Sequence, residues 1–249
     1  VSGLSFGYVY RAMRLRPADL AAFWVKRFFR LAPLYWFAMF GVVGLALVKA
    51  LGRGAPFPYG PAQLALNASL TFGVLDPGSY MVTGGWSIGN EMAYYVVFPF
   101  VVAAAHRSRW WLAPFLAASV AVGALFAWRW IVPTETLGDQ WTAYIHPLSH
   151  IFYFVAGVVL SLTLTPARLP ASVAGAGILA VLVAYTLGPA GADQATIVTR
   201  GPWAYYSLLC IAGCALVYAA AVELPPRASG LLGWLGRASY SVYLLHPLV

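Results

Sequence analysis

Glu91 is the residue of this sequence that is hardest to explain by packing alone. It lies near the start of a long apolar stretch, in the segment WSIGNEMAYY of residues 86–95. If this stretch spans a membrane, an ionisable side chain there is costly and usually faces a cavity or a partner. Helical spacing places Ser87, Tyr94 and Tyr95 on or near the face of Glu91. We predict that Glu91 lines a functional cavity; the alternative is a structural carboxylate that pairs with an arginine of another helix.

Two arginines one helical turn apart, Arg27 and Arg30, form a second candidate site. They lie in the segment KRFFRLAPLYW, residues 26–36. Their guanidinium groups have the geometry to hold a phosphate-bearing ligand at a membrane surface. Topogenic charge and binding of lipid headgroups explain the same residues without a specific ligand, and composition alone favours that simpler explanation.

A polar stripe occurs near the end of the sequence, where Ser239, Tyr243 and His246 share one helical face. Polar groups in an apolar helix usually face the protein interior or a pore. His246 is suited to move protons near neutral pH, or to hydrogen-bond a neighbouring helix. The spacing leaves both roles open.

The patterns that identify many soluble enzymes are missing. There is no glycine-rich phosphate loop, no G-x-S-x-G elbow and no zinc-type array of Cys and His. His146 and His150 flank Pro147 with a spacing that suits a metal ion, but the sequence offers no third ligand nearby. We therefore predict no metal site.

The composition requires a membrane as the surroundings of these residues. In 249 residues, 61% are hydrophobic and 9% are charged, whereas a soluble domain has about 25% charged residues. The net charge of +8 needs only the excess of Lys and Arg that cytoplasmic loops contain, so no nucleic-acid partner is expected. We predict one continuous integral-membrane domain over residues 1–249, in contact with membrane lipids.

Apolar stretches bounded by Gly, Pro and charged residues predict an all-α, polytopic transmembrane bundle with about eight spans or partial spans. Residues 1–10 would be the end of an earlier helix. The other spans are residues 31–50, 86–105, 110–130, 147–164, 171–188, 203–222 and a partial span from 238 to the end.

Basic residues alternate from one connection to the next, which supports this span count and gives an orientation. Cytoplasmic loops contain most of the Lys and Arg residues, so we predict that segment 11–30 is cytoplasmic and that the loop 52–85 lies outside. Within the first segment, residues 17–30 have the pattern of an amphipathic helix at the membrane surface. Eleven of the 15 basic residues fall on the predicted cytoplasmic side: six in segment 11–30, together with Arg107, Arg109, Arg168, Arg227 and Arg237.

Four motifs, in this order, resemble those of the membrane-bound acyltransferase 3 family, bacterial proteins that O-acylate lipopolysaccharide, exopolysaccharide, peptidoglycan and some small molecules. The start of the chain is similar to the end of an F-x-x-S-G-[FY] segment, with Leu4 at the aromatic position. Residues 27–35 are similar to R-x-x-R-x-x-P-x-Y, residues 86–91 to W-S-x-x-x-E, and residues 236–246 to G-x-x-S-Y-x-x-Y-L-x-H. The resemblance covers nearly the whole chain.

The resemblance implies a bundle of about ten helices in the bacterial inner membrane. Acyl-CoA would bind from the cytoplasmic side as the donor substrate, without a further cofactor, and the acceptor would arrive from the far side. The family's catalytic histidine lies on the first membrane helix, which would precede Val1. Because the sequence starts without Met and ends inside an apolar run, we expect a fragment that lacks the first helix and the last helix or helices.

The resemblance also implies a role for each candidate residue. The upstream histidine would deprotonate a sugar hydroxyl, which attacks the thioester carbonyl directly. Arg27 and Arg30 would position the phosphates of CoA, and Glu91 would orient the base or the acceptor hydroxyl. The same cavity would be lined by Trp86, Ser87, Tyr243 and His246.

The implied function is an O-acyltransferase, with acetyl as the favoured group and an exopolysaccharide, O-antigen or related lipid-linked oligosaccharide as acceptor. A proton-coupled transporter or flippase of a glycan or lipid-linked sugar is the alternative, with Glu91 and His246 as a relay. The sequence contains no clear internal repeat to favour it. A third possibility is a non-catalytic membrane subunit that only binds a lipid-linked glycan.

Overall fold

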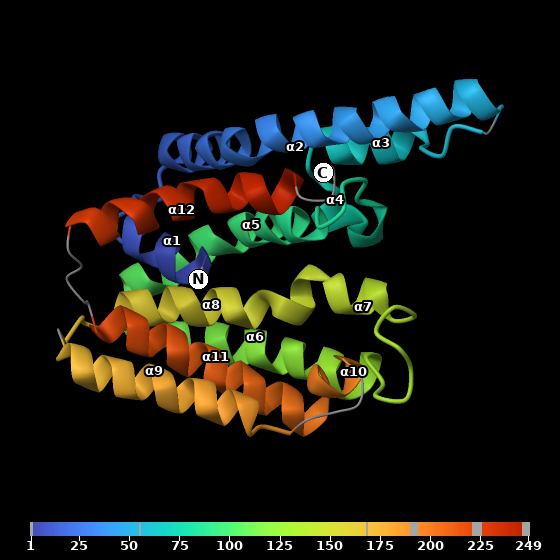
Figure 1. Cartoon of the computed structure of the whole chain (residues 1–249). Coiled ribbons are helices and arrows are strands. Elements are labelled where there is room, and N and C mark those ends of the chain that lie inside the picture. The colour runs from blue at the N-terminus through green and yellow to red at the C-terminus, as the bar shows by residue number, and fades with distance from the viewer. Residues whose placement is uncertain (1, 55, 168, 190–193, 221–225, 246–249) are drawn as a thin grey trace. The chain divides into compact units, whose positions relative to one another are not determined.

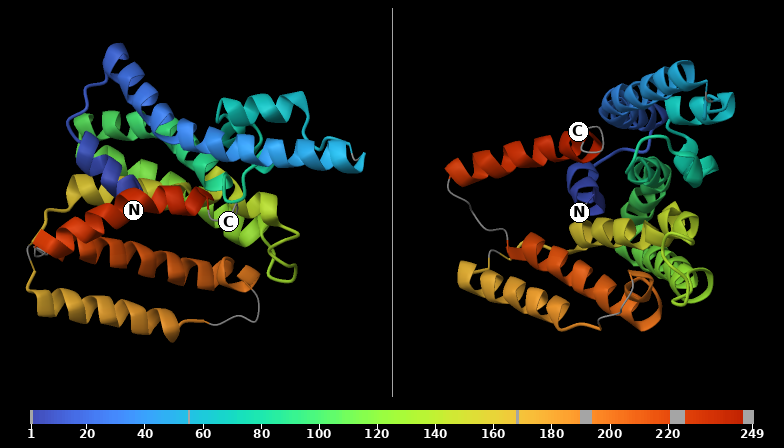
Figure 2. Two further views of the ribbon diagram at one scale, coloured as in Figure 1. Left: turned by 45° about the horizontal axis from the view of Figure 1, so that its top comes forward. Right: turned by 45° about the vertical axis from the view of Figure 1, so that its right-hand side comes forward.

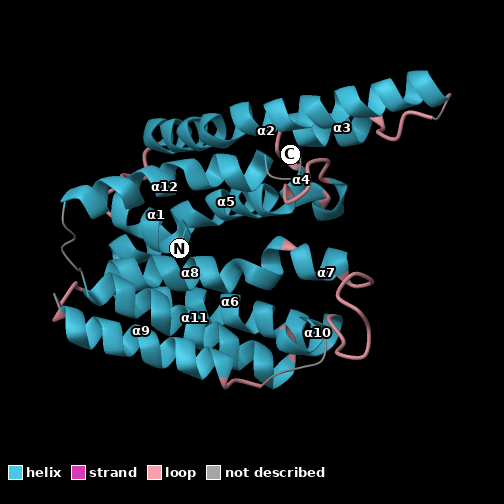
Figure 3. Cartoon of the chain, viewed as in Figure 1, coloured by secondary structure: helices cyan, strands magenta, loops and turns pink. Residues whose placement is uncertain are grey.

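The computed structural model describes residues 2–54, 56–167, 169–189, 194–220 and 226–245 (Figure 1). Within these ranges the chain forms helices, turns and loops, and no strand (Figure 3). The prediction of an all-α protein is therefore confirmed.

Eight helices of the described chain overlap the eight predicted spans and partial spans, although the last of them begins at Pro226 rather than at residue 238. They are α1 (Ser2–Tyr10), α2 (Pro17–Arg53), α5 (Trp86–Arg107), α6 (Leu112–Leu125), α8 (Pro147–Thr163), α9 (Ala171–Thr186), α11 (Arg200–Ala220) and α12 (Pro226–Leu245). Shorter elements lie between them: α3 (Pro61–Ala68), α4 (Phe72–Leu75), η1 (Pro77–Ser79), η2 (Arg109–Trp111), the π-helix η3 (Phe126–Trp130), α7 (Trp141–Ile145) and α10 (Gln194–Ile197).

Five helical stretches of the described residues are long and apolar enough to cross a membrane. They are α2, α5, α6 with its flanking turns, α7 together with α8, and α11. The molecule is thus a multi-pass helical membrane protein, as the composition and span pattern predict.

Helix α2 joins two predicted elements. Residues 17–30 and the predicted span 31–50 form one helix of 37 residues, which continues through Pro33. The surface position of residues 17–30 stays a prediction. A proline removes one backbone hydrogen bond, but packing against neighbouring elements can hold a membrane helix together across it. Leu31, Ala32 and Tyr35 are all buried beside this proline, and Figure 2 shows that α2 changes direction along its course.

Two compact units make up the chain, and α5 contributes residues to both. The α8 unit comprises Val1–Leu15 and Val97–Glu223, and the α2 unit comprises Arg16–Val96 and Leu224–Val249. The prediction of a single membrane domain over the whole chain is not tested by this division and stays a prediction.

In the α8 unit, α1 and α6 both pack on α8. Glycines allow α1 and α8 to approach backbone to backbone: a Cβ atom on Gly157 would lie 2.6 Å from the Leu4 amide nitrogen. Next to this contact, the rings of Phe6, Phe98 and Phe154 meet edge to face, with centroids 5.3 to 6.2 Å apart. Small residues at the crossing and aromatic rings beside it therefore hold the centre of this unit.

The α2 unit is built along the long helix. The indole nitrogen of Trp24 donates to the carbonyl oxygen of Tyr95 at 3.0 Å. Further along α2, the Tyr35 ring stacks on Phe72 with centroids 5.7 Å apart and lies against Gly85. Helices α2 and α5 are therefore antiparallel, and the loop predicted to lie outside packs on α2 through α3 and α4.

The close approach of α1 and α8 gives a test of the packing. We expect Gly157→Ala to lower the thermal midpoint of the protein in detergent, since the new methyl group meets backbone that cannot turn aside; the cost is about 1–3 kcal/mol. The matched control is Gly175→Ala in α9, where an added methyl group would meet no neighbour within 4 Å. An equal midpoint for the two variants would contradict the described helix crossing.

Candidate functional site

The two strongest candidate sites of the sequence meet at one side chain, Tyr95. Its hydroxyl donates to Oε2 of Glu91 at 3.3 Å, one helical turn earlier in α5. Tyr95 is buried and Glu91 is half-buried. The hydrogen bond restricts the carboxylate to one side of the helix.

The arginines of α2 lie beside the same tyrosine. The guanidinium charges of Arg27 and Arg30 are within electrostatic range of the Tyr95 hydroxyl, as is the Glu91 carboxylate. The ring of Phe23 packs edge to face on Tyr95, with centroids 6.1 Å apart, which helps to hold this part of α2 in register with α5. The charges of two arginines and one carboxylate therefore act on one buried phenol, and we call these residues, predicted as separate sites, the Glu91 cluster.

This arrangement keeps both explanations of Glu91 open. The structural alternative requires an arginine of another helix, and Arg27 and Arg30 act on the same tyrosine that Glu91 binds. A cluster with more positive than negative groups also suits an anionic ligand, since guanidinium groups bind phosphate and carboxylate oxygens in pairs.

The carbonyl oxygen of Gly84 joins two of the predicted motifs. It accepts hydrogen bonds from the Ser87 hydroxyl at 3.1 Å and from the Tyr243 hydroxyl of α12 at 3.0 Å. Gly84 has a φ of 78°, a conformation that side chains with a Cβ rarely adopt. The turn before α5 therefore presents its carbonyl to both hydroxyls, and it places Trp86, half-buried, as the first residue of α5. His246 lies outside the described residues.

Sequence reasoning missed Asn67, which positions this turn. Its side chain is completely buried. The amide nitrogen donates to the carbonyl oxygens of Gln63 and Ser79, both at 2.8 Å. The amide oxygen accepts from the Met81 backbone at 3.0 Å and from the Tyr35 hydroxyl. Asn67 thus connects α2, α3 and the segment that leads into α5. A single asparagine in a short apolar helix gives no sequence signal of this role.

A second residue that the sequence did not single out is Asn90, the neighbour of Glu91. It is 4% exposed, and its amide oxygen has no hydrogen-bond partner among the described residues. Buried polar atoms are nearly always hydrogen-bonded. The amide oxygen of Asn90 can therefore accept a hydrogen bond from a water molecule or a ligand. Helix α4 also presses on this turn of α5, since a Cβ atom on Gly73 would lie 2.1 Å from the Gly89 carbonyl oxygen.

A basic pocket lies at one end of the α8 unit. It has a volume of about 600 Å³ and is bordered by Arg11, His106 and Arg109, with the chain that follows α8. An imidazole nitrogen of His106 lies 3.1 Å from the Arg11 carbonyl oxygen. The ends of α1, α5, α8 and α11 meet here, as the alternation of basic residues predicts, whereas the assignment of this end to the cytoplasm stays a prediction.

The histidines considered for a metal have other contacts. Nδ1 of His146 accepts from the Leu148 amide at 3.2 Å, and Nδ1 of His150 is hydrogen-bonded to the Ser149 hydroxyl. Within the described ranges, no three His, Cys, Asp or Glu side chains cluster as metal ligands would. These contacts do not test the prediction of no metal site, which stays a prediction.

Comparison with known proteins supplies the family. The family described as "Acyltransferase domain" has a sequence model that matches residues 1–249. The chain belongs to this family. It is the acyltransferase 3 family that the four motifs indicate, so the protein is a membrane acyltransferase in general terms. No curated protein and no solved structure matches the chain.

The Asn67 contacts predict a stability effect in the loop before α5. Replacing Asn67 with Ala removes four hydrogen bonds and leaves buried donors and acceptors unpaired, which costs more than about 2 kcal/mol. We expect a clear drop in the thermal midpoint in detergent. The control is Ser69→Ala, whose exposed hydroxyl bonds only to nearby groups, and which should melt as the unmodified protein does. A normal midpoint for Asn67→Ala would refute the described network.

Proposed function

We propose that this protein transfers an acyl group, acetyl in the first instance, from acyl-CoA to a hydroxyl of a cell-surface glycan. The observation that supports it is the meeting of Glu91, Arg27 and Arg30 at Tyr95 in a chain of the acyltransferase family. The acceptor is an exopolysaccharide, an O-antigen or a lipid-linked oligosaccharide. The protein lies in the bacterial inner membrane, with segment 11–30 cytoplasmic.

In the proposed reaction the oxygen of a sugar hydroxyl attacks the thioester carbonyl carbon. The carbon–sulfur bond breaks, CoA leaves, and the hydroxyl proton passes by way of a base to the departing sulfur. The base is the histidine that the family resemblance implies. Glu91, held by Tyr95, orients that base or the hydroxyl itself, because a carboxylate accepts a hydrogen bond from either group.

The arginines of the Glu91 cluster suit the donor substrate. CoA bears phosphate groups, and negative charge develops on the carbonyl oxygen during attack; guanidinium groups stabilise both. Ser87 and Tyr243 both bind the Gly84 carbonyl oxygen, and we propose that they contact the substrates beside Trp86. We assign His246 to the same site from its place in the sequence motif of residues 236–246.

Removing the charge of Glu91 should reduce acyl transfer and leave folding intact. In membranes supplied with radiolabelled acetyl-CoA and a crude surface polysaccharide, we expect Glu91→Gln to lower the rate by about 10²-fold or more at matched protein levels. Tyr95→Phe loses one hydrogen bond and should cost less, up to about tenfold. Glu135→Gln, an exposed carboxylate elsewhere, is the control.

A wild-type rate for Glu91→Gln would exclude this role for the carboxylate. If the unmodified protein transfers no short acyl group from CoA to any surface polysaccharide, the proposed reaction is wrong, and the transporter alternative gains support.

The two basic regions make different predictions for the donor. If Arg27 and Arg30 bind the CoA phosphates, Arg30→Ala raises the KM for acetyl-CoA by about tenfold or more, since a charge-assisted hydrogen bond is lost. Arg109→Ala, in the basic pocket of the α8 unit, should then leave this KM unchanged. If Arg109→Ala raises this KM and Arg30→Ala does not, the CoA phosphates bind in the basic pocket of the α8 unit instead. Both values come from the same labelled assay at saturating acceptor.

A further inference from the structure

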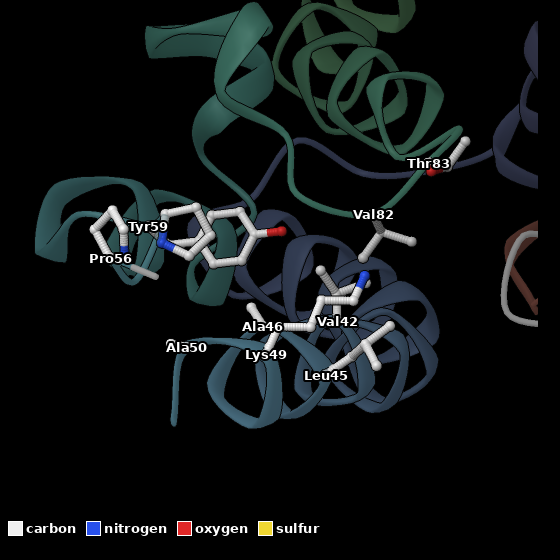
Figure 4. A pocket seen from close by; sticks show the side chains of 10 residues that line it. Val42, Leu45, Ala46, Lys49, Ala50, Pro56, Tyr59, Val82 and Thr83 are labelled. Carbon is white, nitrogen blue, oxygen red and sulfur yellow. The ribbon is translucent and has the colours of Figure 1, made fainter. Parts of the chain in front are cut away.

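A second pocket lies in the α2 unit, near the C-terminal end of α2. Its volume is about 400 Å³, within the range of about 300–1,000 Å³ for small-molecule sites. The residues that matter most are Val42, Leu45, Lys49, Tyr59, Val82 and Thr83 (Figure 4). The loop that lines it is the one predicted to lie outside the membrane.

The walls of this pocket are held in place without a ligand. Gly54 ends α2 with a φ of 63°, which turns the chain back toward the helix. Pro56 and Pro58 restrict the segment that follows. The Tyr59 ring packs edge to face on Phe57, with centroids 5.5 Å apart. An aromatic surface that is already fixed loses little entropy when a ligand binds to it.

One positive charge faces this aromatic surface. Figure 4 shows that the Lys49 ammonium group and the Tyr59 hydroxyl point toward the same space beside Val82. The carboxylates described in the α2 unit belong to Asp19, Asp76 and Glu91, and none of them lines the pocket. Within the described residues, Lys49 forms no ion pair. A ligand with a negative charge would therefore meet a cation that is not yet neutralised.

The hydroxyl groups of the pocket add hydrogen-bonding capacity. Thr83 is exposed, and neither Thr83 nor Tyr59 forms a side-chain hydrogen bond with the described residues. One ammonium group, two hydroxyls and an aromatic face are the groups that a charged sugar needs: a counter-ion, hydrogen-bond partners and a flat apolar surface for its C–H face.

We propose that this pocket is a subsite for the acceptor glycan and that it binds an acidic sugar. The sugar carboxylate pairs with Lys49, its ring packs on Tyr59, and its hydroxyls bond to the Tyr59 and Thr83 side chains. The proposal rests on the proposed acyl transfer and adds the substrate class to it: the acceptor contains uronic acid or a similar acidic residue.

The position of the pocket relative to the Glu91 cluster agrees with this role. Thr83 directly precedes Gly84, whose carbonyl oxygen binds Ser87 and Tyr243. Glu91 follows five residues into α5, a rise of about 8 Å from the start of the helix. Lys49 lies 19 residues beyond Arg30 in α2, about 28 Å along the helix. A polymer with one residue in the pocket therefore presents a residue several sugars further along its chain near Glu91.

A lipid headgroup fits the pocket less well. Segments that recognise anionic lipids contain clusters of about four to eight basic residues, whereas Lys49 is the only Lys or Arg among the described residues that line this pocket. The prolines and the tyrosine face have no function in binding a phosphate. We therefore assign the pocket to a sugar and use a lipid as a competing outcome of the test.

The test measures binding and transfer with one pair of probes, oligogalacturonate and its carboxyl-reduced, neutral counterpart. The protein is studied in phosphatidylcholine nanodiscs, with and without added phosphatidylglycerol. Four variants are compared. Lys49→Met keeps the apolar stem without the charge, and Lys49→Arg keeps the charge. Tyr59→Leu removes the aromatic ring, and Arg53→Met removes a charge one turn further along α2, outside the pocket lining.

We expect the unmodified protein to bind the acidic oligosaccharide more tightly than the neutral one. Lys49→Met should weaken acidic binding by about tenfold or more and leave neutral binding and the KM for acetyl-CoA unchanged. Lys49→Arg should retain most of the preference, and Arg53→Met should retain it fully. Tyr59→Leu should weaken the binding of both probes.

Two outcomes would overturn the proposal. In the first, the preference for the acidic probe is absent or survives in Lys49→Met. In the second, Lys49→Met changes only the response to phosphatidylglycerol, which would make the pocket a lipid site. If Lys49-dependent binding is present but no acyl group is transferred to either probe or to surface polysaccharide, the subsite stands and the proposed acyl transfer fails.

Discussion

The buried amide of Asn67 is the interaction on which the α2 unit depends. Both of its polar atoms are fully paired, with partners in α2, in α3 and in the segment before α5. These hydrogen bonds attach the chain between α2 and α5 to the long helix α2. The start of α5, the turn at Gly84 and the level of Glu91 relative to α2 all follow from where that loop is held. Because the amide is completely buried, each bond is protected from competition with water.

Helix α2 contributes residues to three sites that are far apart in the sequence. Its first part brings Arg27 and Arg30 to Tyr95, its middle part anchors Tyr35 on Asn67, and its end forms a wall of the Lys49 pocket. A break at Pro33 would have separated the first of these from the others. The buried residues beside Pro33 therefore stabilise the helix and also keep Arg27 and Arg30 in line with the rest of α2.

The features that could be predicted are those with a local physical cause. Hydropathy and the alternation of basic residues gave the helices, since both are properties of short stretches. Glu91 was predictable because a charge in an apolar helix is costly wherever it lies. The continuity of α2 was not, because it depends on packing around Pro33. Asn67 was not, because Tyr35 lies 32 residues away along the chain and neither residue alone indicates the contact.

The central claim is that Glu91 and the arginines of α2 act as one site. A double-mutant cycle of Glu91→Gln and Arg27→Met, read as kcat/KM for acyl transfer at matched protein levels, tests it most directly. Groups that share a site are coupled by about 0.5–3 kcal/mol, whereas independent sites add. Each loss of kcat/KM is converted to a free-energy change. The account predicts that the change for the double variant is clearly smaller than the sum of the changes for the two single variants. Strict additivity would contradict it and would mean that the two residues serve separate purposes.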